Sequence, residues 1–378
     1  MRKNYKILAK IMLIAVGALI LIFVGFGLFL IFQSPGKPKP FLDRNGQKIT
    51  SSISEKIFLN INGVQQGMFI KGENIDNPII LYLHGGMPDY FLTEKYPTGL
   101  EKNFTVVWWE QRGCGISYNA GSKSTQTSVE QLVDDTITLT QYLIKRFDKQ
   151  KIYLMAHSGG TFIGIYVIDK SPELYHAYIG IAQMSNQLKS EQMAHKYMLN
   201  QYEESGNRKM AARFRGMRLN DQEELPKDYL KLRDVAMHKL GVGTMRNMKN
   251  LVTGLFIPSI MFSEYTISEK YHLWVSKAAS GISQNWNRMM NIDLMETKNA
   301  FRVPVYFFHG RYDYTCSYEL AKKYFANIQA PVKGFYTFEH SAHSPIFEEP
   351  EKMNKILVDD VLNSSTELAD NIKVESGF

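Results

Sequence analysis

Residues 151–164 constrain the fold of this chain more than any other stretch. The apolar run Ile152–Ala156 predicts a short buried strand, and the apolar residues after Gly160 can begin a helix. Ser158 lies between them, next to the small residues that a sharp strand-to-helix turn requires. Such a turn forms a nucleophile elbow, which exposes its serine at the carboxyl edge of a sheet. The amide of Gly159 would then point at a developing oxyanion, at the positive end of the helix.

The elbow pattern has little specificity by itself, because an ordinary strand-to-helix turn with a solvated serine has the same pattern. Further apolar runs support a sheet. Strands are expected at residues 79–83, 104–109, 177–182, 303–308 and 333–338, and a hairpin at 56–62 and 65–71. Short apolar strands that alternate with helices indicate an α/β fold with a mostly parallel sheet covered on both faces.

The pattern changes between residues 184 and 302, which are rich in Met, Tyr, Lys, Arg and Glu and have helical periodicity. We therefore expect a helical cap over 184–302, inserted into a core made of residues 51–183 and 303–363. Ligands bind beyond the carboxyl ends of the strands in such sheets, so the cap would cover that edge. Residues 364–378 are expected to form a polar tail.

An unbroken apolar run covers residues 11–32. At 1.5 Å per residue it is long enough to span a bilayer core of about 30 Å. A cleaved signal peptide has a shorter apolar region of roughly 7–15 residues, and residues 31–33 do not make a cleavage site. We expect an uncleaved transmembrane anchor in contact with membrane lipid, with a basic N-terminal tail at 1–10 and a Pro-rich linker at 33–50.

Basic residues flank both ends of this run. They are Arg2, Lys3, Lys6 and Lys10 before it, and Lys37, Lys39, Arg44 and Lys48 after it. The first group is more closely spaced, so the N-terminus is expected in the cytoplasm and the catalytic domain on the extracytoplasmic side. The formal net charge is +7, and four of these charges lie in the first ten residues. The folded part is only mildly basic, and no basic-aromatic pattern suggests a nucleic-acid partner.

A serine nucleophile needs a base within hydrogen-bond reach and a carboxylate that orients the base. In a doubly wound hydrolase the acid follows a late strand and the histidine follows the last one. Asp313 and His343 occupy these two places, and His340 is a rival base closer to its strand. His157 adjoins the serine, but neighbouring side chains diverge at a tight turn, which makes it a poor base.

A glycine-containing loop at residues 84–87 follows the strand at 79–83. In such folds this loop donates the second oxyanion amide, which we assign to Gly86 or Met87, beside the amide of Gly159. His84 is expected to support the loop through hydrogen bonds. A plain strand-ending turn is the alternative, but four elements in the right chain order favour the catalytic interpretation.

Three motifs resemble those of the α/β-hydrolase superfamily and of its proline iminopeptidase-type branch. The HGG after the third strand resembles the branch's HGGPG, and WEQRGCGIS at 109–117 resembles its DQRGxGxS. Residues 338–345, with Glu349 and Pro350 behind them, resemble the branch's ending around the catalytic histidine, which favours His343 over His340.

The resemblance covers roughly residues 50–360. It implies the α/β-hydrolase fold, a mostly parallel central sheet flanked by helices with an inserted helical cap. It also implies a triad of Ser158, Asp313 and His343, and a substrate with a small or apolar acyl group.

The chain departs from the branch in several places. Met87 replaces the Pro after HGG, Glu110 the Asp of DQRG, and Ala156 the first glycine of the elbow. The Trp-x-x-Trp-Glu segment associated with holding a peptide's amino terminus is absent. Candidate acids in the cap are Glu203, Glu204, Glu264 and Glu269. The motifs therefore predict a hydrolase, and they do not by themselves predict a peptidase.

The expected activity is that of a membrane-anchored serine hydrolase which acts through an acyl-enzyme on a small peptide, amide or ester substrate. It would need no cofactor and no metal. An aminopeptidase of proline iminopeptidase type is one possibility. The alternatives are an esterase or lipase that acts on acyl esters, and a non-catalytic binding protein on a hydrolase fold.

Overall fold

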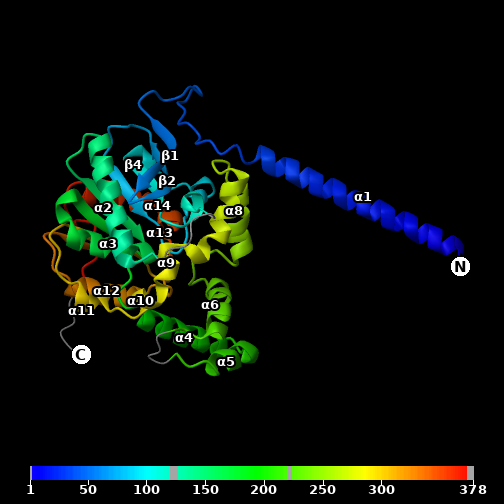
Figure 1. Ribbon diagram of the computed structural model, residues 1–378. Coiled ribbons are helices and arrows are strands. Elements are labelled where there is room, and N and C mark those ends of the chain that lie inside the picture. Colours follow the sequence, from blue (N-terminus) through cyan, green and yellow to red (C-terminus); the bar gives the residue numbers. More distant parts are fainter. Residues whose placement is uncertain (1, 120–126, 220–223, 373–378) are drawn as a thin grey trace.

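The computed structural model describes residues 2–119, 127–219 and 224–372 (Figure 1). Met1 of the expected basic tail and residues 373–378 of the expected polar tail lie outside the described residues.

An eight-stranded sheet runs through the body of the molecule. Its strands are β1 (Ile53–Ile61), β2 (Val64–Gly72), β3 (Ile79–Leu83), β4 (Thr105–Glu110), β5 (Ile152–His157), β6 (Tyr175–Ile181), β7 (Val305–Gly310) and β8 (Lys333–Phe338). The spatial order is β1-β2-β4-β3-β5-β6-β7-β8. The pairs β1–β2 and β2–β4 are antiparallel and the others parallel. This is the mostly parallel sheet that the sequence predicts.

Both faces of the sheet are covered, which explains the continuous apolar strands. In β3, Ile79 and Leu81 belong to one apolar cluster, whereas Ile80 and Tyr82 belong to another, because successive side chains point to opposite faces. The first cluster includes residues of α2 (Val129–Arg146), α3 (Gly159–Lys170) and α12 (Tyr318–Asn327). The second includes residues of η1 (Tyr90–Glu94), α13 (Pro345–Glu348), α14 (Pro350–Ile356) and η7 (Leu357–Val361).

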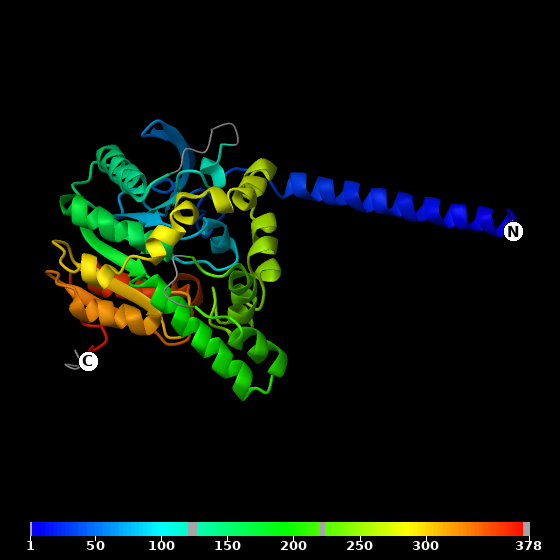
Figure 2. The same ribbon diagram turned by 60° about the horizontal axis from the view of Figure 1, so that its bottom comes forward.

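Residues between β6 and β7 form a helical insert. Its helices are α4 (Gln187–Glu204), α5 (Arg208–Arg215), α6 (Lys227–Leu240), η5 (Val252–Phe256), α7 (Ile257–Met261), α8 (Ile267–Val275), η6 (Lys277–Ala279), α9 (Gly281–Gln284), α10 (Trp286–Met290) and α11 (Leu294–Thr297). A third apolar cluster, which includes Met198, Phe214 and Tyr229, joins α4, α5 and α6. Figure 2 shows the green helix α4 extending away from the sheet, with α5 at its far end. Short 3-10 turns elsewhere are η2 (Leu100–Lys102), η3 (Gly115–Ser117) and η4 (Pro172–Leu174).

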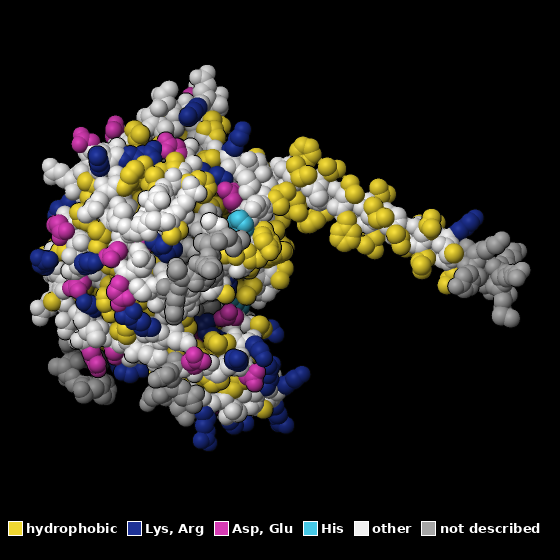
Figure 3. Space-filling model, in the orientation of Figure 1, with side chains coloured by type: hydrophobic (Ala, Val, Ile, Leu, Met, Phe, Trp, Pro, Cys, Tyr) yellow, Lys and Arg dark blue, Asp and Glu magenta, His cyan; other side chains and the backbone are white. Residues whose placement is uncertain are grey.

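The N-terminal helix α1 (Arg2–Phe32) projects from the body (Figure 1). Its residues Ile7–Phe32 are long and apolar enough to cross a membrane, and none of that stretch is buried against the rest of the chain. Figure 3 shows its apolar side chains along most of the projecting segment. A membrane anchor and a signal sequence both contain a helix of this kind near the N-terminus.

Candidate active site

Ser158 lies at the turn from β5 into α3, with a backbone conformation of φ 54° and ψ −126°. Non-glycine residues rarely adopt a positive φ, and such strain costs about 1–3 kcal/mol. Glycines allow the neighbouring chain to approach this turn. A Cβ on Gly160 would lie 2.5 Å from Leu83 O, and one on Gly85 would lie 2.8 Å from Ser158 Cβ. The turn therefore has the strain and the close packing of a nucleophile elbow.

Asp313 lies buried just beyond the end of β7. Its carboxylate contacts nearby backbone amides and histidine side chains. Its Oδ1 accepts hydrogen bonds from the backbone amides of Thr315, at 2.8 Å, and Cys316, at 3.0 Å. Its Oδ2 lies 2.9 Å from Nδ1 of His343. Burial alone would raise the pKa of Asp313, but the imidazoles of His343 and His309 outweigh it and hold the pKa well below its usual range. Asp313 is thus a carboxylate at neutral pH.

His343 follows β8 and is nearly fully buried. Burial lowers the pKa of its imidazole, and the opposing effect of Asp313 does not compensate, so the ring is neutral near pH 7. Its Nδ1 donates to Asp313, which leaves Nε2 as the unprotonated nitrogen. This is the protonation state of a general base. His340, the rival in the sequence, is exposed, and its backbone amide donates to Glu349 Oε2 at 3.0 Å.

His309 is a second histidine beside Asp313, and no role was predicted for it from the sequence. It is fully buried at the end of β7, and its Nε2 lies 3.2 Å from Asp313 Oδ2. The same nitrogen donates to the carbonyl oxygen of Cys316 at 2.8 Å. Its position four residues before the predicted acid, on the same strand end, is a signal that could have found it.

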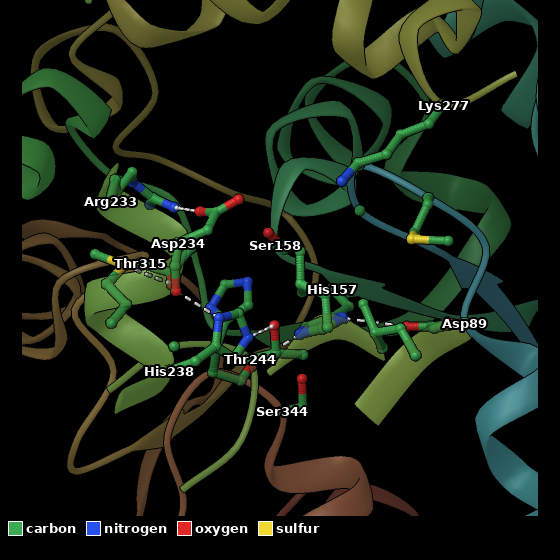
Figure 4. Close-up of a pocket in the computed structure, with 18 of the residues that line it drawn as sticks. Asp89, His157, Ser158, Arg233, Asp234, His238, Thr244, Lys277, Thr315 and Ser344 are labelled. Atoms are coloured by element: carbon green, nitrogen blue, oxygen red, sulfur yellow. Dashed lines mark hydrogen bonds and ion pairs between the residues drawn. The ribbon is translucent and has the colours of Figure 1, made fainter. Parts of the chain in front are cut away.

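His157 supports the chain that carries His343. Its Nε2 donates to the carbonyl oxygen of His343 at 2.8 Å, and its Nδ1 lies 3.3 Å from Asp89 Oδ2 (Figure 4). The same carboxylate oxygen accepts a hydrogen bond from Tyr82 at 2.7 Å. The ring therefore joins the loop after β3 to the loop after β8.

The loop at residues 84–87 approaches the serine from the end of β3. His84 Nδ1 donates to Gly85 O at 2.8 Å, and its Nε2 accepts from the amide of Gln111 at 3.1 Å. Burial lowers the pKa of His84 to about 4, so the ring stays neutral, as these two bonds require. Gly86 and Met87 follow it and line the cavity described next.

A cavity of about 380 Å³ brings together Ser158, His343 and the 84–87 loop under the helical insert. Its apolar lining includes Phe91, Leu225, Leu230, Met237, Leu251, Leu255, Trp286 and Phe347. The size is in the range of small-molecule sites, and polar and charged side chains are interspersed with this apolar lining. Among the described residues, no group of three or more His, Cys, Asp or Glu side chains is placed to hold a metal ion.

Residues 77–247 match the family described as serine aminopeptidase, S33. Among curated proteins, the probable aminopeptidase YbaC of Bacillus subtilis (strain 168) is 28% identical over 296 residues, which are 77% of this chain and 91% of that protein. The chain is an enzyme of the α/β-hydrolase fold.

Solved structures show the same fold at low sequence identity. A proline iminopeptidase-related protein from Thermus thermophilus has a TM-score of 0.57 and 17% identity, over 81% of this chain and 98% of that one. The proline iminopeptidase of Mycobacterium smegmatis has a TM-score of 0.56 and 11% identity, over 82% and 98%. A 2-hydroxy-6-oxo-6-phenylhexa-2,4-dienoate hydrolase from Rhodococcus sp. strain RHA1 has a TM-score of 0.54 and 13% identity, over 82% of this chain and 98% of that one. The predicted fold class is confirmed.

Most of the charged groups of this hydrolase's cavity come from the helical insert, whereas Asp89 comes from the loop after β3. Arg233 of α6 forms a two-pronged ion pair with Glu191, with both N–O distances at 2.6 Å, and also contacts Asp234 at 2.7 Å. Lys277 extends toward the cavity from another part of the insert (Figure 4), and its side chain has no hydrogen bond or ion pair within the described parts of the chain.

The cap acids singled out from the sequence do not line this cavity. Glu264 instead pairs with Lys71 at 3.1 Å, and Glu269 with Lys56 at 2.9 Å. The acids that do line it are Glu191, Asp234 and Asp89. Glu191 and Asp234 lie on α4 and α6, where helical periodicity alone does not distinguish a cavity wall from a solvated helix face.

Glu110, at the end of β4, gives a pH-dependent prediction for this hydrolase. Burial raises the pKa of its carboxyl to about 8, whereas the unfolded chain titrates near 4.3. The folded state then binds more protons in this window, so stability falls as the pH rises through it, by about 1.4 kcal/mol per pH unit. We expect Glu110→Gln to remove this contribution to the pH dependence, because an amide does not titrate in this range. The variant should stay folded, because the amide oxygen can accept from Ile116 N and the amide nitrogen can donate to Tyr265.

Thermal unfolding of the two proteins between pH 5 and about pH 9 measures the difference. Glu173→Gln at an exposed site is the matched control and should keep the wild-type dependence. Parallel curves for wild type and Glu110→Gln would contradict the prediction.

Proposed function

We propose that this enzyme is a serine hydrolase in which Ser158 is the nucleophile, His343 the general base and Asp313 the residue that orients the base. The observation that carries the proposal is the hydrogen bond from His343 Nδ1 to Asp313, at 2.9 Å. It leaves a neutral imidazole with Nε2 free in the cavity that also contains the strained serine. A serine, a base and an orienting acid are the parts of a catalytic triad.

In the proposed reaction, Nε2 of His343 accepts the proton of the Ser158 hydroxyl while Oγ attacks the carbonyl carbon of the substrate. Negative charge moves to the carbonyl oxygen, where the amide of Gly159 and that of Gly86 or Met87 donate to it. The imidazolium, stabilised by Asp313, then gives its proton to the leaving group, and an acyl-enzyme remains. Water, deprotonated by the same nitrogen, hydrolyses the acyl-enzyme and restores the serine.

An aminopeptidase activity on small peptides or amides is the first candidate for the substrate class. The matched family and the Bacillus relative are both described as aminopeptidases. Glu191 and Asp234 are acids in the cavity wall that could face a substrate ammonium group, although Arg233 already pairs with both. An acyl esterase is the second candidate, and the largely apolar lining favours it.

We also propose that residues 11–32 are an uncleaved membrane anchor, with the catalytic domain on the extracytoplasmic side. The length and the exposed apolar surface of α1 support this. The contacts of the helix end support it as well, since Lys270 donates to Gln33 O at 3.0 Å and to Ser34 Oγ at 2.8 Å. A cleaved signal peptide would not be expected to end in hydrogen bonds to the folded domain.

Labelling the full-length protein in detergent with a fluorophosphonate tests the nucleophile. This reagent reacts with activated serines, so peptide mass mapping should find the label on Ser158, and Ser158→Ala should stay unlabelled. Failure to label a protein that unfolds cooperatively on heating would contradict the proposal.

The substrate class is tested with matched pairs. The first pair is an aminoacyl p-nitroanilide and its N-acetylated form, and the second is a short and a medium-chain p-nitrophenyl ester. An aminopeptidase should prefer the free amine by a large factor in kcat/KM, because an acid in the cavity pairs with it. Equal rates for the two anilides, with faster ester cleavage, would favour the esterase.

A further inference from the structure

Apolar side chains project outward from one side of the helical insert. We define this apolar face by six residues of η5, α7 and α8, which are Val252, Phe256, Ile257, Met261, Tyr271 and Val275. Each is at least 40% exposed, and Tyr271 reaches 65%. The helices that carry them pack together, since Phe256 contacts the ring of Trp274 on α8 with 5.4 Å between ring centroids. Exposed apolar side chains gathered on a folded domain mark an interaction surface.

The apolar face lies where α1 joins the body. Lys270 of α8 donates to Gln33 O and Ser34 Oγ, and also to Ile260 O at 2.6 Å. Gln33 in turn donates to the carbonyl oxygen of Met261. In Figure 3 the apolar side chains of α1 adjoin an apolar area on the neighbouring edge of the body. These contacts fix the apolar face beside the end of the hydrophobic helix.

We propose that the apolar face rests on the lipid surface of the membrane that α1 enters. The inference rests on the proposed anchor, because a bilayer spanned by α1 ends close to Gln33 and so reaches the level of this face. Helices with an apolar side lie in the interfacial layer of a membrane, and the amphipathic ring of Tyr271 suits the headgroup level. Lys95, whose Nζ donates to Thr253 O at 3.4 Å, adds a cation at the edge for anionic headgroups.

The other side of the same turn belongs to the catalytic cavity. Leu251 and Leu255 line the cavity, whereas Val252 and Phe256 point outward. A single helical turn thus separates the cavity from the lipid surface. The substrate that fits this arrangement is an amphiphile whose apolar part is drawn from the membrane into the apolar cavity and whose acyl carbon reaches Ser158.

The test uses the full chain reconstituted into vesicles of equal parts phosphatidylcholine and phosphatidylglycerol, with nitroxide-labelled acyl chains as quencher. A fluorophore is attached to one introduced cysteine at a time, and the native Cys114 and Cys316 are buried. Phe256→Cys and Tyr271→Cys report on the apolar face. Tyr142→Cys, at a position 37% exposed on α2, is the matched control away from it.

We expect at least threefold stronger quenching at 256 and 271 than at 142. Leu21→Cys within α1 checks insertion. If the fluorophore at position 21 is quenched while those at positions 256 and 271 are quenched no more than the one at 142, the docking inference is wrong and the anchor is supported. If 21 is not quenched, the anchor and the inference fall together, and fluorophosphonate labelling of Ser158 is unaffected by either result. Cross-linking of two copies through 256, without quenching, would also overturn the inference in favour of a second copy.

A functional measurement separates docking from catalysis. Phe256→Glu combined with Tyr271→Glu should leave the hydrolysis of a water-soluble p-nitrophenyl ester unchanged, since neither side chain lines the cavity. Turnover of a long-chain acyl ester held in the same vesicles should fall several-fold. An equal rate on the vesicle-borne ester would overturn the proposed substrate route.

Discussion

Replacing Asp313 by Asn is expected to lower kcat by about 10⁴ while the protein stays folded. The amides of Thr315 and Cys316 both donate to Oδ1, so the Asn oxygen must occupy that position. Its NH₂ group then takes the place of Oδ2 and donates to Nδ1 of His343. The imidazole proton is forced onto Nε2, the nitrogen that must accept the proton of Ser158.

The measurement combines the rate of fluorophosphonate labelling with the hydrolysis of a soluble p-nitrophenyl ester. His340→Ala is the matched control, because this exposed histidine lies three residues before the proposed base and should leave both rates unchanged. Wild-type rates for Asp313→Asn, or a loss of labelling in His340→Ala, would refute the assignment of acid and base.

Replacing Gly310 by Ala is expected to lower the stability of the folded protein strongly. A Cβ at this position would overlap the carbonyl oxygen of Ala342 and lie 2.6 Å from that of Ser341. Both obstacles are backbone, so the chain that carries His343 must shift. Overpacking of this kind costs up to about 3 kcal/mol, which lowers Tm by up to roughly 4 °C in a chain of this size.

Gly86→Ala is the matched glycine control for the thermal unfolding of Gly310→Ala. Nothing lies within 4 Å of a Cβ at Gly86, so its Tm should equal that of the wild type. If the two glycine variants melt at the same temperature, the packing argument for Gly310 is wrong.

Much of the sheet could be predicted because its strands are buried on both faces. The run at 333–338 matches β8 residue for residue, and the run at 152–156 stops one residue short of the end of β5. A strand of this kind needs no partner to be recognised, because the continuous apolar sequence itself reports burial. The elbow was equally visible, since its backbone strain and close packing demand small residues at fixed positions.

The interior of the site could not be predicted in the same way. The contacts from His157 to Asp89 and to His343 O join segments that are 68 and 186 residues apart. The insert adds a further difficulty, because its helices bury one face against each other and another against the sheet. Glu264 lies in the turn between α7 and α8 and pairs with Lys71, 193 residues away in the sequence, although it was a candidate for the cavity. A local sequence pattern carries no information about such long-range pairing.

The junction between α1 and the body has a mechanical consequence. After Gln33 and Ser34 the chain does not swing freely, since Lys39 N donates to Glu264 Oε1 at 2.9 Å and Lys39 O accepts from Lys71 Nζ at 2.8 Å. A flexible linker would let a membrane-tethered enzyme take many orientations and heights above the bilayer. An enzyme anchored through this stiff junction would instead keep its cavity at one height and one tilt relative to the bilayer, and would turn only about the helix axis. Reactants held in the bilayer would then reach it by diffusing in two dimensions.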